Sequence, residues 1–438
     1  MIYGMNSLAP TYKPSVHPVF YRLYPGHQGA DRMLFYFLLA LPVVNAIGDS
    51  TIYYFKEADA GGGMHPGIIR GIILIIFILL FGYQRIRDNK PTRYILAFLA
   101  YLFILTLFSS DVRLSFLSGY IKWFIPLMMF PVGVYFFRNT DQLLALNKAY
   151  VWGALLVCIN LAVAQFTDFG ISAYVEESFY TGGAGVGITN QLALILLTYP
   201  FLIRQRKKTS LHTRWMIYIV GFISLIFVLI AMKRAGIISL LAGTLIYLYL
   251  TQSRARFIRY FIIVIILFYL VFPAFQSVLA ERYNARLEQM QNIEDEARYQ
   301  EFFFVLKEFR EGDIAHRLFG SELFNSGSTF GRKYFHSSRI IHSDLSSFFY
   351  GAGLIGLALY ISVFVLLLRN GAGYRRILRM YPVDRELYAI YFALLLATFL
   401  ISVSGSGTIG ERCLAFLYLG AVTGLSGFKM YDRLKSKD

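Results

Sequence analysis

The chain has 438 residues, of which 57% are hydrophobic and only 16% are charged, and its formal net charge is +16 at pH 7. A soluble protein carries roughly 25% charged residues, so this composition excludes an ordinary soluble domain and indicates a polytopic membrane protein. In such a protein the surplus of Lys and Arg belongs to cytoplasmic loops, and it gives no reason to predict a nucleic-acid partner. The two cysteines, Cys158 and Cys413, lie in apolar runs and predict no disulfide framework.

The polar N-terminal stretch 1–32 lacks the basic, apolar and small-residue pattern of a cleaved signal peptide, so we expect none there. After it, apolar windows of near-bilayer length predict twelve transmembrane helices. The expected ranges are 33–49, 68–84, 94–109, 117–137, 149–167, 187–204, 215–232, 235–251, 260–276, 347–368, 386–403 and 412–427. Asp and Glu are nearly absent from these ranges, which disfavours a proton- or sodium-driven carrier because such carriers need an intramembrane carboxylate.

The Lys and Arg residues are distributed unevenly between the connecting segments. If both termini lie inside, the inner segments hold 26 of the 42 Lys and Arg residues, the long segment 277–346 holds nine, and the other outer positions hold seven. Because inner loops carry the excess of positive charge, we predict that both termini are cytoplasmic. The segment 277–346 is then outside, which in a Gram-negative cell is the periplasm.

These patterns predict an all-α polytopic membrane protein of about twelve transmembrane helices. Residues 1–276 would form the cytoplasmic tail and nine spans, 277–346 a periplasmic helical subdomain, and 347–438 the last three spans and a cytoplasmic tail. Within the subdomain, three-to-four spacing of apolar residues predicts a helix that stops near Gly312. Asp313 is expected to cap a short helix that ends at Gly320.

Motifs that hold a metal or a nucleotide are missing from the sequence. It contains no Gly-rich phosphate loop, no HExxH, no CxxC, no GxSxG and no DxD. The acidic run Glu294-Asp295-Glu296 would point its carboxylates in different directions on a helix. We therefore expect no metal site and no cofactor, and chemistry built from Arg, Lys and His.

Several basic side chains on the outer side are candidate ligands for an anion. Arg298 lies on the predicted loop helix, where an ion pair with Glu294 is the alternative explanation. Arg282 and Arg286 are four residues apart, a repulsive spacing that an anion would relieve, although two solvated arginines are the simpler case. Arg339 belongs to the stretch SSRIIHSDLSS that precedes the tenth span.

Two further candidates lie at helix turns near the outer surface. Lys233 and Arg234 start the eighth span in the turn AMKRAG, where they could bind an anionic headgroup or simply extend to the membrane surface. Asn190 follows the Gly-rich loop GGAGVGIT, whose backbone could approach a ligand, and it could equally cap the sixth span.

His342 stands at the entrance of the tenth span without a simple structural reason for its position. Ser343 or Asp344 can cap that helix, which is a sufficient explanation for Asp344. A helix N-terminus favours neutral imidazole, so His342 is equipped to accept a proton from a hydroxyl group. The glycines that follow, in GAGLIG at 351–356, predict close packing against neighbouring helices.

Four segments, in order, resemble the bacterial O-antigen ligase and polysaccharide polymerase superfamily, and together they cover about the second half of the chain. They are GAGVGITNQLALILLTYPFLI, AMKRAGIISLLAGTLIYL, ARYQEFFFVLKEFREGDIAHRLFGSELF and IIHSDLSSFFYGAGLIGLALY. Two departures stand out: this chain has Lys233-Arg234-Ala235 where the family shows Ser-Arg-Gly, and His-Ser-Asp where ligases more often show His-Asn.

The resemblance implies a metal-independent, inverting glycosyltransferase of the bacterial inner membrane that uses a polyprenyl-pyrophosphate-linked glycan as donor and a glycan hydroxyl as acceptor. By position it implies that His342 is the base and that Arg298 and Arg234 hold the pyrophosphate. The second departure favours a polymerase of repeat units, with a chain-length regulator as a further partner besides membrane lipids. A ligase that transfers the glycan to lipid A-core and a lipid-linked glycan flippase are the alternatives.

Overall fold

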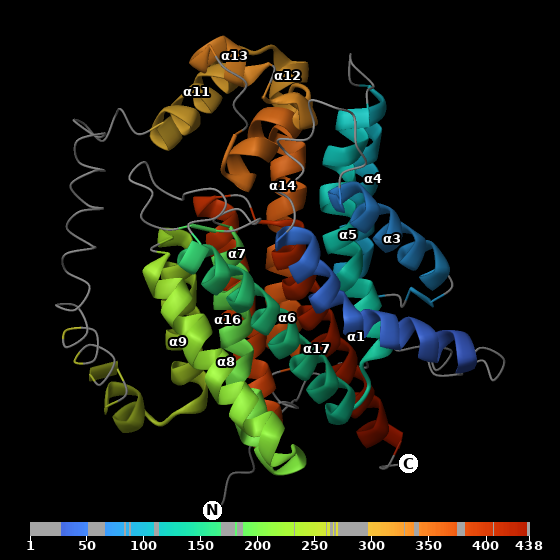
Figure 1. The fold of residues 1–438 in the computed structure, drawn as a ribbon. Helices are drawn as coiled ribbons and strands as arrows, with labels where there is room; N and C mark the ends of the chain where they lie inside the picture. Colours follow the sequence, from blue (N-terminus) through green and yellow to red (C-terminus); the bar gives the residue numbers. More distant parts are fainter. Residues whose placement is uncertain are drawn as a thin grey trace, which may run out of the picture.

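The computed structural model describes most of the helical core and part of the outer segment. The described residues are 28–50, 66–82, 85–86, 89–108, 114–167, 180–181, 187–231, 233–259, 297–327, 329–336, 341–374, 382–405 and 407–435, with a few isolated positions at 261–269. Over these residues the chain is helical and has no strand. Figure 1 shows long helices side by side, with a group of short helices above one end of them.

Within the part of the chain that the structure describes, eight helices contain a stretch long and apolar enough to cross a bilayer. They are α1 (Gln28–Ser50), α4 (Lys90–Leu107), α5 (Leu114–Phe136), α6 (Thr140–Thr167), α8 (Leu211–Ile230), α9 (Arg234–Thr251), α14 (Asp344–Gly373) and α16 (Pro382–Ser404). Three further helices belong to the same bundle: α3 (Pro66–Phe81), α7 (Ile188–Arg204) and α17 (Ile409–Lys435). This is the architecture of a polytopic helical membrane protein.

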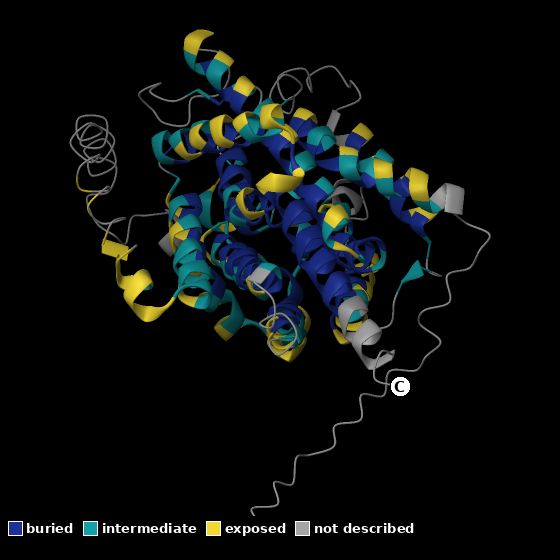
Figure 2. Cartoon of the chain, turned by 90° about the horizontal axis from the view of Figure 1, so that it is seen from below, coloured by how far each residue is buried: buried dark blue, intermediate teal, exposed yellow. Residues whose placement is uncertain are grey.

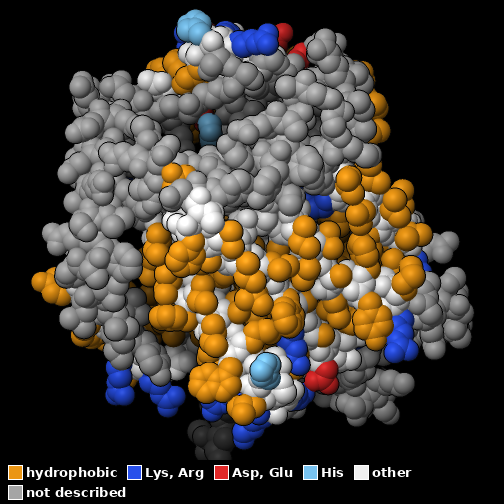
Figure 3. All heavy atoms as spheres, viewed as in Figure 1, with side chains coloured by type: hydrophobic (Ala, Val, Ile, Leu, Met, Phe, Trp, Pro, Cys, Tyr) orange, Lys and Arg blue, Asp and Glu red, His pale blue; other side chains and the backbone are white. Residues whose placement is uncertain are grey.

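The surface of the bundle has the pattern that a bilayer requires. Large apolar side chains point outward, among them Leu79, Phe108 and Phe166 at 71%, 83% and 89% exposure. In Figure 3 these apolar side chains form a broad band across the molecule, and Lys and Arg gather along its lower edge. In Figure 2 the helices at the centre of the bundle are buried, and the exposed residues lie at its periphery.

Eleven of the twelve predicted spans coincide with a helix in the structure, and the ninth, 260–276, lies largely outside the described residues. The predicted turn between the seventh and eighth spans is present, since α8 ends at Ile230 and α9 begins at Arg234. The number of twelve spans stays a prediction.

The predicted spans contain two acidic residues, each at the end of its range, and both are paired with an arginine. Asp49 in α1 and Arg70 in α3 form an ion pair with both side chains buried, Arg70 Nη1 lying 2.5 Å from Asp49 Oδ1. Glu386 lies in α16, where Arg204 reaches it at 2.6 Å. A charge in a helix is tolerated when a partner on a neighbouring helix compensates it, and apolar windows alone do not reveal such pairs.

Glycines permit a close contact between α5 and α17. A Cβ on Gly133 would lie 2.5 Å from the Leu417 carbonyl oxygen, and a Cβ on Gly420 would lie 2.2 Å from the Phe130 carbonyl oxygen. Only glycine permits this approach, which is the usual way in which membrane helices pack closely.

Three short helices cover the end of the bundle where α14 begins. They are α11 (Ala297–Glu311), α12 (Ile314–Phe319) and α13 (Phe330–Phe335). Their apolar side chains form a cluster of their own, with Val305, Phe330, Ile341 and Tyr350 buried in it.

The boundaries predicted for this region are confirmed where they can be compared. Helix α11 ends at Glu311, and Asp313 caps α12 by accepting a hydrogen bond from the His316 backbone N–H at 2.7 Å. Helix α12 ends at Phe319, and Gly320 is its C-cap, with a φ of +77° that favours glycine. The predicted helical stretch before Ala297 lies outside the described residues.

Helix α14 is interrupted at Gly353, where φ is +64° and ψ is −166°. A Cβ there would lie 2.4 Å from the carbonyl oxygen of Leu318, because the end of α12 packs directly against this position. At the break, two backbone carbonyl groups of α14 accept hydrogen bonds from outside the helix. Ser321 N–H donates to Tyr350 O at 2.9 Å, and Tyr101 OH donates to Ala352 O at 2.8 Å. The predicted close packing of GAGLIG is thus present, together with a break that was not predicted.

Candidate functional site

His342 lies directly before α14, in the segment that connects α13 to it. Its ring contacts Glu301 of α11, with Nδ1 2.8 Å from Glu301 Oε1. The second oxygen of the same carboxylate, Oε2, accepts a hydrogen bond from the His342 backbone N–H at 3.0 Å. Glu301 therefore holds both the backbone and the ring of His342.

This double contact selects one form of the imidazole. A carboxylate only accepts hydrogen bonds, so Nδ1 must carry the proton. In the neutral ring, Nε2 is then left with a lone pair. Glu301 is 3% exposed, whereas the side chain of His342 is 38% exposed. The Nδ1 side of the ring is thus held by a buried carboxylate while the side chain as a whole is partly exposed, an arrangement that suits a general base.

A second carboxylate fixes α11 in place two turns further along. Glu308 accepts hydrogen bonds from Lys333 and, at 2.5 Å, from Tyr334, both on α13. Burial by itself would raise the pKa of Glu308, but the bonds from Lys333 and Tyr334 outweigh it and hold that pKa below its ordinary value. One face of α11 therefore makes two polar contacts: Glu301 contacts His342, and Glu308 contacts α13.

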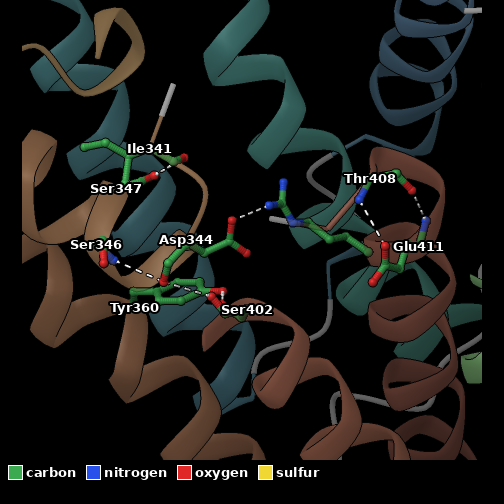
Figure 4. A network of polar contacts seen from close by, with 10 residues as sticks. Ile341, Asp344, Ser346, Ser347, Tyr360, Ser402, Thr408 and Glu411 are labelled. Carbon is green, nitrogen blue, oxygen red and sulfur yellow. Dashed lines mark hydrogen bonds and ion pairs between the residues drawn. The ribbon is translucent and has the colours of Figure 1, made fainter. Parts of the chain in front are cut away.

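The assignment of Asp344 as a helix cap is wrong. The cap of α14 is Ser343, whose Oγ accepts from Ser346 N–H. Asp344 is 3% exposed and pairs with Arg412 of α17, Arg412 Nη2 lying 2.6 Å from Asp344 Oδ1. Arg412 in turn stacks on the Trp123 ring at 3.8 Å from its centroid. Figure 4 shows Asp344 pointing from α14 toward this partner.

Next to the pair of Asp344 and Arg412, Thr408 and Glu411 form a capping box at the N-terminus of α17. Thr408 N–H donates to Glu411 Oε2 at 3.1 Å, and Glu411 N–H donates to Thr408 Oγ1 at 3.2 Å. Both bonds are drawn in Figure 4. A small cavity opens between the two groups, and it is lined by Asp344, Tyr360, Thr398, Ile401, Ser402, Gly407, Glu411, Arg412 and Phe416.

The predicted turn residues lie at the same end of the bundle. Lys233 is near enough to Glu411 for their charges to interact. A Cβ on Gly187, at the start of α7, would lie 3.5 Å from Lys233 Nζ and 2.9 Å from Thr408 Cγ2. The starts of α7, α9 and α17 thus meet around Lys233, while Arg234 beside it is exposed.

Asn190 does not reach the surface. It lies in the first turn of α7, is 1% exposed, and faces α9, since a Cβ on Gly236 would lie 2.9 Å from Asn190 Oδ1. Neither polar atom of its amide has a hydrogen-bond partner among the described residues. It is not the cap of α7, a position that Gly187 occupies.

The remaining predicted ligands can be placed only in part. Arg298 belongs to α11, three positions before Glu301. Arg282, Arg286 and Arg339 lie outside the described residues.

Sequence reasoning missed Glu301 and Arg412. A carboxylate on an outer helix is normally solvated, and nothing next to Glu301 marks it as different. The helical pattern does contain a signal, because three-to-four spacing places Glu301 and Glu308 on the same face as Phe304 and Val305. A helix face that combines acidic and apolar residues indicates that its carboxylates make buried polar contacts. Arg412 was placed at the edge of a span, where a partner for it on another span could not be inferred.

Among the described residues, no group of three or more His, Cys, Asp and Glu side chains is arranged to hold a metal ion. No protein-family model and no curated protein matches the sequence. The candidate site therefore rests on its own geometry: a histidine held by a buried carboxylate, above a bundle end that carries Lys233, Arg234 and Arg412.

Proposed function

We propose that the chain is an inverting glycosyltransferase of the bacterial inner membrane that polymerises oligosaccharide repeat units carried on polyprenyl pyrophosphate. An acceptor hydroxyl attacks the anomeric carbon of the donor glycan, and the pyrophosphate leaves. His342 accepts the proton of that hydroxyl at Nε2. Arg298 and Arg234 hold the pyrophosphate, with Lys233 adding positive charge nearby.

The contact between Glu301 and His342 is the observation that carries this proposal. A flippase forms no new bond at an acceptor hydroxyl, so it does not need a base there, whereas the double contact with Glu301 leaves Nε2 of His342 as the nitrogen that can accept a proton. A hydroxyl nucleophile needs such a base, and general-base assistance is worth about 10²–10⁴ in rate. The neighbouring cations suit a leaving group of high negative charge.

The proposed location follows from the same arrangement. The short helices α11–α13 lie at one end of the bundle (Figure 1), and Lys and Arg gather at the lower edge of the molecule in Figure 3. Basic residues lie where α5 and α7 end and where α8 begins, namely Arg138, Lys208 and Arg214. Under the positive-inside rule the basic end is cytoplasmic and the His342 end faces the periplasm. Both termini would be cytoplasmic, in a protein of about twelve spans.

Deletion of the gene, followed by gel analysis of surface polysaccharide, tests the proposal in the cell. A polymerase predicts single-repeat products, and the wild-type gene should restore long chains while the His342→Ala gene should not. Undecorated lipid A-core with long chains left on the polyprenyl carrier would indicate a ligase instead. Full restoration by His342→Ala would favour a flippase. Loss of long chains only when a chain-length regulator is absent would identify that partner.

A further inference from the structure

Helix α11 presents two carboxylates to the segment that carries His342. Glu301 and Glu308 are seven residues apart and therefore share a face of the helix. Glu308 bonds to Lys333 and Tyr334, and Glu301 bonds to His342. Between them, Val305 is 1% exposed in the apolar cluster. The same helix face thus contains a docking contact and a contact to the proposed base.

The two contacts of Glu301 leave little freedom in how they are made. The backbone N–H of His342 is an obligatory donor, so one oxygen of Glu301 is committed to it. The other oxygen faces Nδ1 and can only accept. Of the two neutral tautomers of His342, the one with the proton on Nδ1 is therefore the one that fits.

We propose that Glu301 is the positioning residue of this site: it keeps the His342 proton on Nδ1 and compensates the charge that the ring acquires during transfer. This inference rests on the proposed function. As the acceptor oxygen bonds to the anomeric carbon, the bond from that carbon to the pyrophosphate oxygen breaks and the pyrophosphate takes the electron pair. The hydroxyl proton moves to Nε2, and the imidazolium lies 2.8 Å from a buried carboxylate.

Glu301→Gln separates positioning from simple docking. Glutamine has nearly the same shape as glutamate, but an NH₂ group, which donates hydrogen bonds, replaces one of the two accepting carboxylate oxygens. Because the backbone N–H still needs the amide oxygen, the amide NH₂ faces Nδ1 and stabilises the tautomer with its proton on Nε2. The lone pair needed for catalysis is then lost. We expect the turnover rate to fall by about 10²–10⁴-fold with an unchanged KM for the donor.

The matched control is Glu308→Gln, on the same face of the same helix. It removes the charge from the docking contact without touching His342, so it should lower thermal stability but leave the turnover rate of the folded protein within a few fold. Glu301→Asp retains two acceptors on a shorter side chain and should recover part of the rate. In a His342→Ala background, Glu301→Gln should have no further effect on turnover.

The deciding experiment combines ¹⁵N NMR of histidine-labelled full-length protein with turnover assays. The His342 signals are identified by their loss in His342→Ala and recorded at a pH where the ring is neutral. We expect the proton on Nδ1 in the wild type and on Nε2 in Glu301→Gln. The proposal is overturned if the tautomer is the same in both proteins, or if Glu301→Gln and Glu308→Gln reduce turnover equally. Should the wild type transfer no glycan, the proposed function is wrong, and the NMR comparison still decides whether Glu301 sets the tautomer.

Discussion

Asp344 and Arg412 form a buried ion pair that joins the first residue of α14 to the first turn of α17, with 2.6 Å between Arg412 Nη2 and Asp344 Oδ1. Since His342 precedes Asp344 by two residues, the pair also fixes the segment that carries the proposed base. Loss of one partner leaves a buried charge without compensation, which is the costly way to break such a pair.

Asp344→Asn should therefore destabilise the protein strongly, by about 3–5 kcal/mol. Ser343→Ala, which removes the actual cap of the same helix, should cost only about 1 kcal/mol. Thermal unfolding of the two purified variants in detergent measures the difference. If both variants lose the same small amount of stability, the charge on Asp344 is dispensable and its pairing with Arg412 does not stabilise the protein.

Gly353→Ala should disturb the break in α14. The left-handed φ of +64° and the Leu318 carbonyl oxygen, 2.4 Å from the position of a Cβ, both oppose any side chain. A strained residue of this kind costs about 1–3 kcal/mol before the clash is added.

Gly373→Ala, at the end of the same helix, is the control, because a Cβ there meets no atom within 4 Å. The unfolding temperature should fall for Gly353→Ala and stay near the wild-type value for Gly373→Ala. A tolerated alanine at 353 would mean that α14 runs through this position without a break.

The topology can be tested with single cysteines. Both natural cysteines, Cys158 and Cys413, are buried and should give little background. A cysteine replacing Ala315, which is exposed in α12, should react with a membrane-impermeant reagent from outside, and one replacing Ser436 only after permeabilisation. The opposite pattern would place His342 on the cytoplasmic side and exclude the proposed donor orientation.

Removal of either proposed pyrophosphate ligand should weaken donor binding as well as turnover. A charge-assisted hydrogen bond is worth about 1.5–3 kcal/mol, so Arg298→Ala and Arg234→Ala should each raise the donor Kd about ten- to a hundredfold. Lysine at 298 should rescue only in part because a point charge cannot replace the planar guanidinium. Binding of labelled donor to purified variants measures this, and unchanged Kd values for both alanine variants would place the phosphate elsewhere.

The sequence predicted the features that depend on local patterns. Apolar windows located eleven helices of the bundle, and the Asp313 cap and the Gly320 stop were correct because a cap or a left-handed residue is determined within a few positions. Asp344 shows the limit of the same reasoning. Its position allowed a local explanation, while its partner Arg412 lies 68 residues further along the chain.

The candidate site was predictable only in part for the same reason. His342 was singled out because no local role explained it. Glu301 was not, since its distinction is burial against a segment 41 residues away, and burial depends on how α11 docks. The pair of Asp49 and Arg70 was missed because two apolar windows give no sign that their charged residues face each other.

The most direct test of the account measures donor binding and glycan transfer by purified wild-type protein and His342→Ala, with a polyprenyl-pyrophosphate-linked oligosaccharide as donor and EDTA present. The account predicts transfer by the wild type, and a loss of about 10²–10⁴-fold in His342→Ala with a donor Kd close to that of the wild type. Transfer that stops with EDTA, or a His342→Ala variant that retains most of its rate, would contradict the assignment of His342 as the base of a metal-independent transferase.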